Sequence, residues 1–264
     1  WGLFPSFSAG WNVHKEAFWN AFQRYVNTLK VRGSWGQLGN QDVAPYSDLT
    51  LMPLHMGKLN YIFEFGGTLP IGYTTAPGLT NKRLTWETAT TKNIGLDLSF
   101  LDNRLEAKVD LFGRLTTNMV ARSEAKPGVL GAGVPEDNNA TLRTRGWELG
   151  LNWKQSFENS SYYINLNVSD NTTVITEYYN PTNTLSTWYE GQELGEIWGY
   201  TAHDLFRTEE ELDNYLSSVD LSFIYPTWNT GDVKYLDTNN DERVDNGSYT
   251  KDDHGDLSII GNNQ

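Results

Sequence analysis

Between residues 93 and 112, the sequence NIGLDLSFLDNRLEAKVDLF places an apolar residue at every second position on both sides of a short turn. Successive side chains on a β-strand point to opposite faces, so this period of two predicts a hairpin with its turn at residues 101–103. The predicted apolar face consists of Ile94, Leu96, Leu98, Phe100, Leu105, Ala107, Val109 and Leu111, and the other face carries Asp97, Glu106, Lys108 and Asp110. One side of these strands must therefore meet an apolar medium, either a protein core or lipid.

The same alternation recurs along the chain and predicts an all-β fold of antiparallel strands. We expect strands at about residues 3–13, 29–35, 92–100, 104–113, 145–154 and 161–169. Residues 14–28 contain an aromatic stretch that fits a turn or two of helix, and two further connections are short. The others are long, at residues 36–91, 114–144 and 170–264. Brief turns at one end of the strands and long loops at the other are typical of a transmembrane β-barrel with periplasmic turns and extracellular loops.

Composition narrows the function classes. The formal net charge of −13 argues against nucleic acid as a partner, because such binding needs a basic surface. The absence of cysteine excludes disulfides and thiolate metal sites.

Trp147 and Trp153 lie at the two ends of one predicted strand, as expected for the aromatic girdles of a barrel. A soluble β-sandwich with decorated loops shows the same alternation and stays open at this point.

Six blocks of sequence carry a family resemblance. They are WGLFPSFSAGWNV (1–13), LKVRGSWGQLGNQ (29–41), LTWETATTKNIGLDLSFLDNRLEAKVDLFGRLTTNMV (84–120), RGWELGLNW (145–153), GQELGEIWGY (191–200) and GDVKYLDTNNDERVD with GDLSIIGN (231–262). In this order they resemble the SusC/RagA family of TonB-dependent outer-membrane transporters from Bacteroidetes-type bacteria.

The resemblance implies a multi-pass antiparallel transmembrane barrel of 22 strands with a plugged lumen, in the outer membrane of a Gram-negative bacterium. Residues 1–264 would form a partial β-barrel domain from the C-terminal half, with the plug domain and the remaining strands outside this sequence. The apolar face of the strands would meet membrane lipid, and the polar face would line the lumen.

The function implied by the resemblance is TonB-dependent import of oligosaccharides or peptides. Its implied partners are a SusD-like surface lipoprotein, which closes over the extracellular loops, and the TonB complex, which acts through the missing N-terminal part. Two alternatives remain open: a secreted β-sandwich that binds carbohydrate, and an adhesin that shares the barrel but has no lipoprotein partner.

The sequence does not predict an enzyme. His14, His55, His203 and His254 have no spacing that suits a metal site. Neither a nucleophile elbow nor a phosphate-binding glycine loop occurs. Thr208 precedes three glutamates, which predicts a capped helix start rather than a pair of catalytic carboxylates. We therefore expect no catalytic residue and no organic cofactor.

The segment DTNNDERVD predicts a calcium-binding loop. Asp237, Asn239 and Asp241 fall at positions 1, 3 and 5 of an EF-hand-like loop, Arg243 would offer its carbonyl at position 7, and Asp245 stands at position 9. Two features oppose this interpretation. Glu242 replaces the glycine of position 6 and Ser248 stands at position 12, so Asp252 or Asp253 would have to supply the last ligand. An acidic, solvated loop is the alternative.

Aromatic residues in the long connections are candidates for contact with a ligand or partner. Trp188, Tyr189, Trp198 and Tyr200 could stack on sugar rings or contact a lipoprotein, and the alternative is that they pack loops against each other. Tyr61, Phe63 and Phe65 form a second aromatic group that is considered for the same role.

Overall fold

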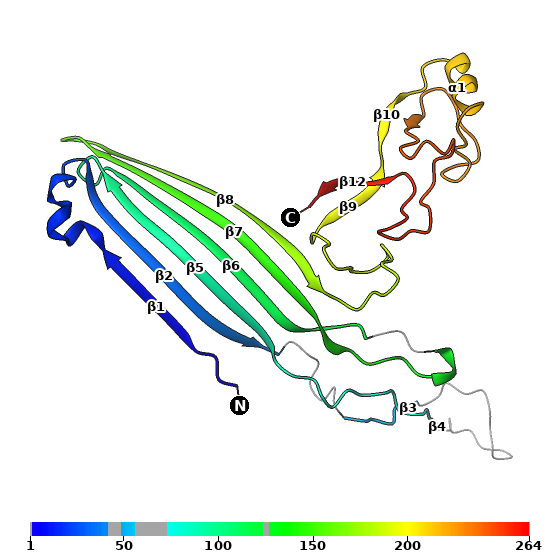
Figure 1. Cartoon of the computed structure of the whole chain (residues 1–264), viewed down its shortest axis with the longest axis horizontal. Coiled ribbons are helices and arrows are strands. Elements are labelled where there is room, and N and C mark those ends of the chain that lie inside the picture. Colours follow the sequence, from blue (N-terminus) through cyan, green and yellow to red (C-terminus); the bar gives the residue numbers. More distant parts are fainter. Residues whose placement is uncertain (1, 42–48, 56–72, 124–126, 264) are drawn as a thin grey trace.

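A computed structural model describes residues 2–41, 49–55, 73–123 and 127–263, so Tyr61, Phe63 and Phe65 lie outside the described residues. Its largest element is an antiparallel sheet with the strand order β1-β2-β5-β6-β7-β8, whose strands curve together (Figure 1). These strands are β1 (Ser6–Asn12), β2 (Val26–Asn40), β5 (Glu87–Phe100), β6 (Leu105–Ala121), β7 (Asp137–Ser156) and β8 (Ser161–Glu177). The predicted all-β, antiparallel fold class is confirmed.

Most strands run further than their alternation predicted, and β1 is shorter. The predicted strand at 29–35 occupies Val26–Asn40, and the one at 145–154 occupies Asp137–Ser156. The predicted loops at 36–91 and 114–144 therefore shrink to residues 41–86 and 122–136. The extensions are rich in threonine, as in ETATT at 87–91 and NTTVIT at 171–176. Threonine favours strands without marking one face as apolar, so a search for alternation misses these segments.

Cross-strand register aligns the apolar residues of all six strands. Val31 lies opposite Leu96, Leu96 opposite Val109, Val109 opposite Leu149 and Leu149 opposite Val168. We call the side of the sheet that carries these residues the apolar face, and the opposite side the polar face. The apolar band on this face consists of Phe7, Trp11, Leu29, Val31, Trp35, Ile94, Leu96, Leu98, Phe100, Leu105, Ala107, Val109, Leu111, Trp147, Leu149, Leu151, Trp153, Ile164, Leu166 and Val168.

The apolar band has no covering layer in the described part of the chain. Beside the main sheet, the described residues form three two-stranded sheets: two within residues 196–262, and one of β3 (Leu54–His55) with β4 (Tyr73–Thr74). None of them packs on the apolar face. Ile94 is 66% exposed and Ile164 is 58% exposed. The second layer that a β-sandwich requires is therefore missing among these residues, and the sandwich alternative is wrong for this fold.

The connections differ at the two ends of the sheet. At one end, residues 101–104 join β5 to β6, residues 157–160 join β7 to β8, and the 3₁₀ turns η1 (Val13–Lys15) and η2 (Ala17–Ala21) lie between β1 and β2. At the other end lie the long connections, which contain β3, β4 and η3 (Gly128–Leu130) (Figure 1). The sheet therefore has a turn end and a loop end, as the lengths of the connections predicted.

The turn after β5 uses three consecutive left-handed residues. Leu101, Asp102 and Asn103 have φ values of +54°, +55° and +62°. Ser99 Oγ donates a hydrogen bond to Asn103 Oδ1 at 2.6 Å, and Asn103 N donates to Asn27 Oδ1 at 3.4 Å. Side-chain amides thus hold a backbone conformation that leucine rarely adopts.

Residues 178–263, here called the C-terminal module, were predicted to be part of a long loop at 170–264. The structure differs in that β8 continues to Glu177 and the remainder has its own elements and core. The module contains β9 (Glu196–Tyr200), β10 (Ala202–Leu205), α1 (Glu209–Leu216), β11 (Val233–Tyr235) and β12 (Leu257–Asn262), and Figure 1 shows it beyond the loop end of β8. Its strands pair as β10-β11 and β12-β9. Its buried core is formed by Phe206, Leu212, Leu221 and Val244.

The start of α1 is as the sequence predicted. Thr208 has extended backbone angles, and its Oγ1 accepts a hydrogen bond from Glu211 N at 3.1 Å. The glutamates of the first turn lie at the positive end of the helix dipole. In the described residues, no helix has the length and apolar character needed to cross a membrane.

An ion-pair network crosses the middle of the polar face. Arg32 of β2 donates from Nε to both carboxylate oxygens of Asp97 at 3.0 Å and from Nη2 to Asp110 of β6 at 2.9 Å. The strand between them, β5, has Gly95 at the crossing point, paired with Arg32 on one side and Asp110 on the other. A Cβ atom on Gly95 would lie 2.6 Å from the guanidinium and 2.6 Å from Asp110 Oδ1. The missing side chain thus lets Arg32 reach across a strand.

We expect Gly95→Ala to lower the free energy of unfolding by about 2 kcal/mol, because its methyl group overpacks the site and displaces charge-assisted hydrogen bonds. Gly33→Ala is the matched control, because a Cβ atom there meets nothing within 4 Å. Urea unfolding of the full-length protein in detergent measures both. Equal effects of the two substitutions would show that Arg32 does not depend on the gap at Gly95.

Candidate functional site

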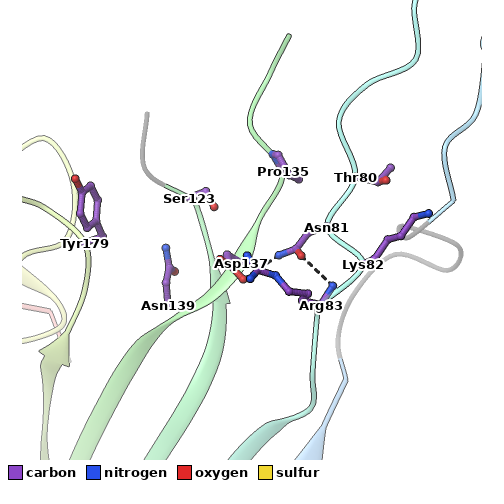
Figure 2. A pocket seen from close by; sticks show the side chains of 9 residues that line it. All are labelled: Thr80, Asn81, Lys82, Arg83, Ser123, Pro135, Asp137, Asn139 and Tyr179. Carbon is purple, nitrogen blue, oxygen red and sulfur yellow. Dashed lines mark hydrogen bonds between the residues drawn. The ribbon is translucent and has the colours of Figure 1, made fainter. Parts of the chain in front are cut away.

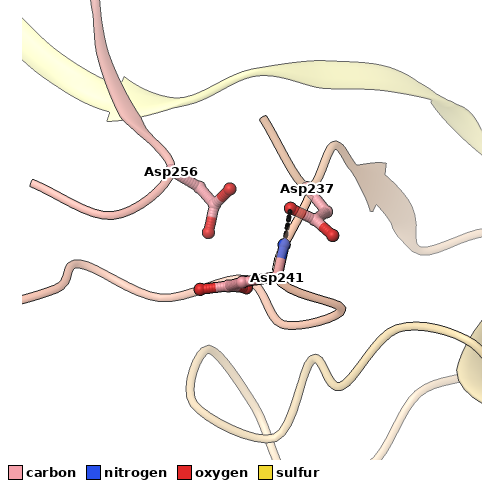
Figure 3. A group of neighbouring side chains, drawn as sticks. All are labelled: Asp237, Asp241 and Asp256. Atoms are coloured by element: carbon pink, nitrogen blue, oxygen red, sulfur yellow. Dashed lines mark hydrogen bonds between the residues drawn. The ribbon is translucent and has the colours of Figure 1, made fainter. Parts of the chain in front are cut away.

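Three carboxylates converge between β11 and β12 in the C-terminal module. Asp237, Asp241 and Asp256 each have an oxygen within 4.8 Å of the others (Figure 3). Asp237 and Asp241 belong to the predicted calcium loop. Asp256 comes from the chain just before β12.

Asp237 organises the backbone of the loop. Its Oδ1 accepts hydrogen bonds from Asn240 N at 2.6 Å and Asp241 N at 3.3 Å, and its Oδ2 accepts from Glu242 N at 2.8 Å. Asn240 and Glu242 have φ values of +61° and +67°. Glu242 therefore adopts, at position 6, the left-handed conformation for which calcium loops normally use glycine.

Asp256 is the member of the cluster that the sequence interpretation missed. It is fully buried. Its Oδ1 accepts hydrogen bonds from Thr238 N at 2.6 Å and Thr238 Oγ1 at 3.1 Å, and its Oδ2 accepts from Asp245 N at 2.9 Å. Because these donors lie in the predicted calcium-binding loop, Asp256 connects that loop to β12. No local spacing rule connects residue 256 to residue 237.

The two predicted late ligands lie elsewhere. Asp252 Oδ2 accepts a hydrogen bond from Asn183 Nδ2 at 3.1 Å. Asp253 Oδ2 accepts one from Ser248 N at 3.1 Å. The Ser248 hydroxyl, together with its backbone N–H, lowers the pKa of the Asp253 carboxyl. Neither Asp252 nor Asp253 belongs to the three-carboxylate cluster, and Asp256 takes the position beside Asp237.

The other predicted ligands of the loop are engaged with each other or with the backbone. Arg243 Nε lies 3.2 Å from Asp245 Oδ2, and Asp245 Oδ1 accepts a hydrogen bond from Gly247 N at 2.7 Å. Asn239 Oδ1 accepts one from Asp241 N at 3.0 Å. Asp245 is not part of the three-carboxylate cluster.

An all-oxygen group of this kind suits a hard cation such as calcium better than zinc. The charges of Asp245 and Asp256 add to burial, the largest cause, in raising the pKa of the nearby Tyr200 phenol, so the negative field extends beyond the loop. In the described parts of the chain, no cluster of potential metal ligands contains a histidine. Calcium binding by this loop stays a prediction.

The four predicted contact aromatics do not form one exposed platform. Tyr189 is only 3% exposed, and its hydroxyl donates a hydrogen bond to Glu196. Burial and this carboxylate raise the pKa of the Tyr189 phenol. Its ring therefore offers almost no surface to a ligand, and the predicted contact role of Tyr189 stays untested.

The other three aromatics are partly buried by neighbouring rings. The ring centroids of Trp188 and Tyr178 are 5.7 Å apart, those of Trp198 and His254 are 5.1 Å apart, and those of Tyr200 and Tyr235 are 5.9 Å apart. Tyr200 packs against the core of the module. Contact of Trp188, Trp198 or Tyr200 with a ligand or partner stays a prediction for the surface that these rings leave exposed.

A polar hollow of about 600 Å³ lies at the loop end of the sheet, between the chain before β5 and the ends of β6 and β7 (Figure 2). Asn81 Nδ2 donates to Asp137 Oδ1 at 2.8 Å, and Asn81 Oδ1 accepts from Arg83 N at 3.0 Å. Asn139 Oδ1 is buried there and has no hydrogen-bond partner among the residues that the structure describes. Lys82 and Arg83 add positive charge to the rim. Such a lining suits a ligand rich in hydroxyl or carboxylate groups.

Sequence reasoning missed this hollow because its residues come from two separate connections. Asn81 to Arg83 lay in the predicted loop 36–91, and Asp137 and Asn139 lay in the predicted loop 114–144. The only local signal was the run of Asn, Lys and Arg before β5. The extension of β7 to Asp137 brings the two groups together.

Comparison with known proteins gives consistent matches. A family model described as TonB dependent receptor-like, beta-barrel, matches residues 1–258. TonB-dependent receptor SusC of Bacteroides thetaiotaomicron is 31% identical over 156 residues, which are 58% of this chain and 15% of that protein. TonB-dependent receptor P39 of Formosa agariphila is 26% identical over 214 residues, which are 80% of this chain and 20% of that protein.

Solved structures share the fold. A structure of the RagAB peptide importer in the closed-closed state gives a TM-score of 0.64 at 18% identity and covers 98% of this chain and 25% of its own. A structure of the RagAB peptide transporter gives a TM-score of 0.60 at 20% identity and covers 76% of this chain and 22% of its own. The chain thus spans a quarter or less of the length of these relatives.

We expect calcium to protect the backbone amides of the loop that contains Asp237 and Asp241 from hydrogen exchange. Calcium at about ten times its dissociation constant would stabilise the folded loop by about 1.4 kcal/mol. Asp241→Asn should weaken this effect. Asp252→Asn, outside the cluster, should leave it unchanged. Equal protection by magnesium, or none by calcium at about 10 mM, would identify the loop as an acidic turn without a calcium site.

Proposed function

Since the chain belongs to the family of TonB-dependent receptor-like β-barrels, we propose that it forms part of the wall of an outer-membrane importer. The imported nutrient would be an oligosaccharide or a peptide, and the energy would come from the TonB complex through parts of the protein outside this sequence. Transport of this kind breaks no bond in the nutrient. A non-enzymatic role agrees with the names of the relatives, which are receptors and a peptide transporter.

The observation that carries the proposal is the uncovered apolar band. Its residues line up across six strands while the polar face of the same strands carries charges and amides, such as Arg32, Asp97 and Asn167. In a barrel wall this arrangement supplies lipid contact on one side and a wet lumen on the other. An exposed apolar surface of this extent would cause aggregation in water.

A second support is the asymmetry of the two ends. The polar hollow at Asn81 and the C-terminal module both lie at the loop end, where an importer receives its nutrient. The module exposes Phe223 and Tyr225, which are 47% and 60% exposed. Aromatic side chains are frequent at protein interfaces, so we propose this end as the contact for a SusD-like surface lipoprotein.

The import proposal is tested with the full-length protein in its native membrane. We expect it in the outer-membrane fraction, with a SusD-like lipoprotein that co-purifies in detergent. Deletion of the gene for the barrel protein should abolish growth on one oligosaccharide or peptide source and leave growth on glucose unchanged. An adhesin would instead purify without such a lipoprotein, and deletion of its gene would reduce attachment rather than growth.

The orientation of the wall predicts unequal effects of arginine on the two faces. Leu96→Arg places a charge in the middle of the apolar band and should reduce stability by about 2–4 kcal/mol, with less protein in the outer membrane. Asn167→Arg, on the polar face, should have little effect. Heat-modifiable mobility on gels and quantitative immunoblots of the membrane fraction measure both outcomes. A greater loss for Asn167→Arg would reverse the assignment of the two faces.

A further inference from the structure

Three cations stand on the apolar face just beyond the apolar band, at the loop end. In one cross-strand row, Trp35 lies opposite Lys92, Lys92 opposite Gly113 and Gly113 opposite Arg145. Arg143 lies in the next row, opposite Leu115. Because side chains alternate along a strand, Lys92, Arg143 and Arg145 point to the same side as Ile94 and Trp147.

These residues form a hollow of about 340 Å³, here called the basic hollow. Gly113 provides its floor between Lys92 and Arg145, and a Cβ atom there would approach only the Thr144 carbonyl, at 4.0 Å. The Trp35 ring contributes an apolar wall on the side of the apolar band. The hollow thus combines three positive side chains with one aromatic surface.

The three cations are not neutralised within the described chain. No ion pair or side-chain hydrogen bond involves Lys92, Arg143 or Arg145 among the residues that the structure describes. All three are exposed. Arg32 on the polar face differs, because it is held by two carboxylates. The basic hollow therefore offers charge to a partner outside the chain.

The lining of the basic hollow contains no acidic residue. Asp170 lies on the apolar face opposite Trp147, in the row next to that of Arg145, and forms no ion pair with Arg145 among the described residues. At the turn end, the same face ends in Gln155 and Tyr162. Arg104 at that end is hydrogen-bonded to Gln155. Among the described strand residues of the apolar face, the unpaired positive charges are thus those of the basic hollow, at the loop end.

We propose that the basic hollow binds the phosphate of a lipid whose acyl chains lie on the apolar band. Arginine binds phosphate oxygens through paired hydrogen bonds, lysine adds a point charge, and tryptophan is favoured at membrane interfaces. A phosphorylated lipid of the leaflet at the loop end would satisfy the cations with its phosphate and cover the neighbouring part of the apolar band with its acyl chains. The inference rests on the proposed membrane placement and goes beyond import, since the site faces away from the lumen.

The test uses the full-length protein purified from outer membranes in a neutral detergent. Native mass spectrometry counts the bound lipid after titration with diphosphorylated lipid A, with the same lipid lacking its phosphates, and with inorganic phosphate. We expect lipid A to bind, the dephosphorylated lipid to bind much less, and K92Q/R143Q/R145Q to lose about tenfold or more of the affinity for lipid A. The matched control K30Q/K108Q/K154Q removes the same charge from the polar face and should bind as the wild type does.

Three results would overturn the proposal: equal binding of lipid A by both triple variants, equal binding of both lipids by the wild type, or binding of inorganic phosphate that explains all of the dependence on these cations. Arg145→Gln alone is the second variant, in case the triple variant does not fold, and Arg145→Lys should retain most of the binding. The amount of each variant in the outer-membrane fraction is measured separately. Absence of the wild-type protein from that fraction would refute the membrane placement, whereas an inserted wild-type protein that ignores lipid phosphate would refute only the lipid site.

Discussion

The pairing register of the six long strands is the constraint on which the rest of the structure depends. A shift of one residue between β5 and β6 would place a charged residue, Lys108 or Asp110, opposite Leu96. The apolar band exists only because five successive pairings keep the same phase. The polar face depends on the same register. Arg32 of β2 reaches Asp110 of β6 across β5 because Gly95, which has no side chain, lies at the crossing point.

The alternation of residues therefore determined much of the fold in advance. It predicted the hairpin at residues 93–112, the antiparallel arrangement of the strands, and the apolar and polar faces of the sheet. Thr208 with the glutamates after it predicted the start of α1. It failed where apolar and polar residues do not alternate, as in the threonine-rich ends of β5 and β8. It also failed for the C-terminal module, whose core residues, such as Phe206 and Val244, are far apart and follow no period.

The candidate sites show the same limit on a smaller scale. Local spacing found Asp237 and Asp241 because an EF-hand-like loop is continuous in sequence. It could not find Asp256, which enters from another segment, nor the polar hollow, which two connections assemble. It also could not rank Tyr189 below its neighbours, because burial depends on the packing of the whole module. Chemistry that is local in sequence was predictable, and chemistry assembled by tertiary contacts was not.

The sheet and the C-terminal module obtain their stability in different ways. The module buries Phe206, Leu221 and Val244 against its own residues, as a water-soluble unit does. The sheet has no comparable core among the described residues, and its edge strand β1 offers unpaired backbone groups to a neighbour. It needs an apolar medium and further strands to be stable, whereas the module has a buried core of its own and is hydrogen-bonded to the end of β8. A wall that is completed by its surroundings can thus carry, at its loop end, a folded unit with a structure of its own.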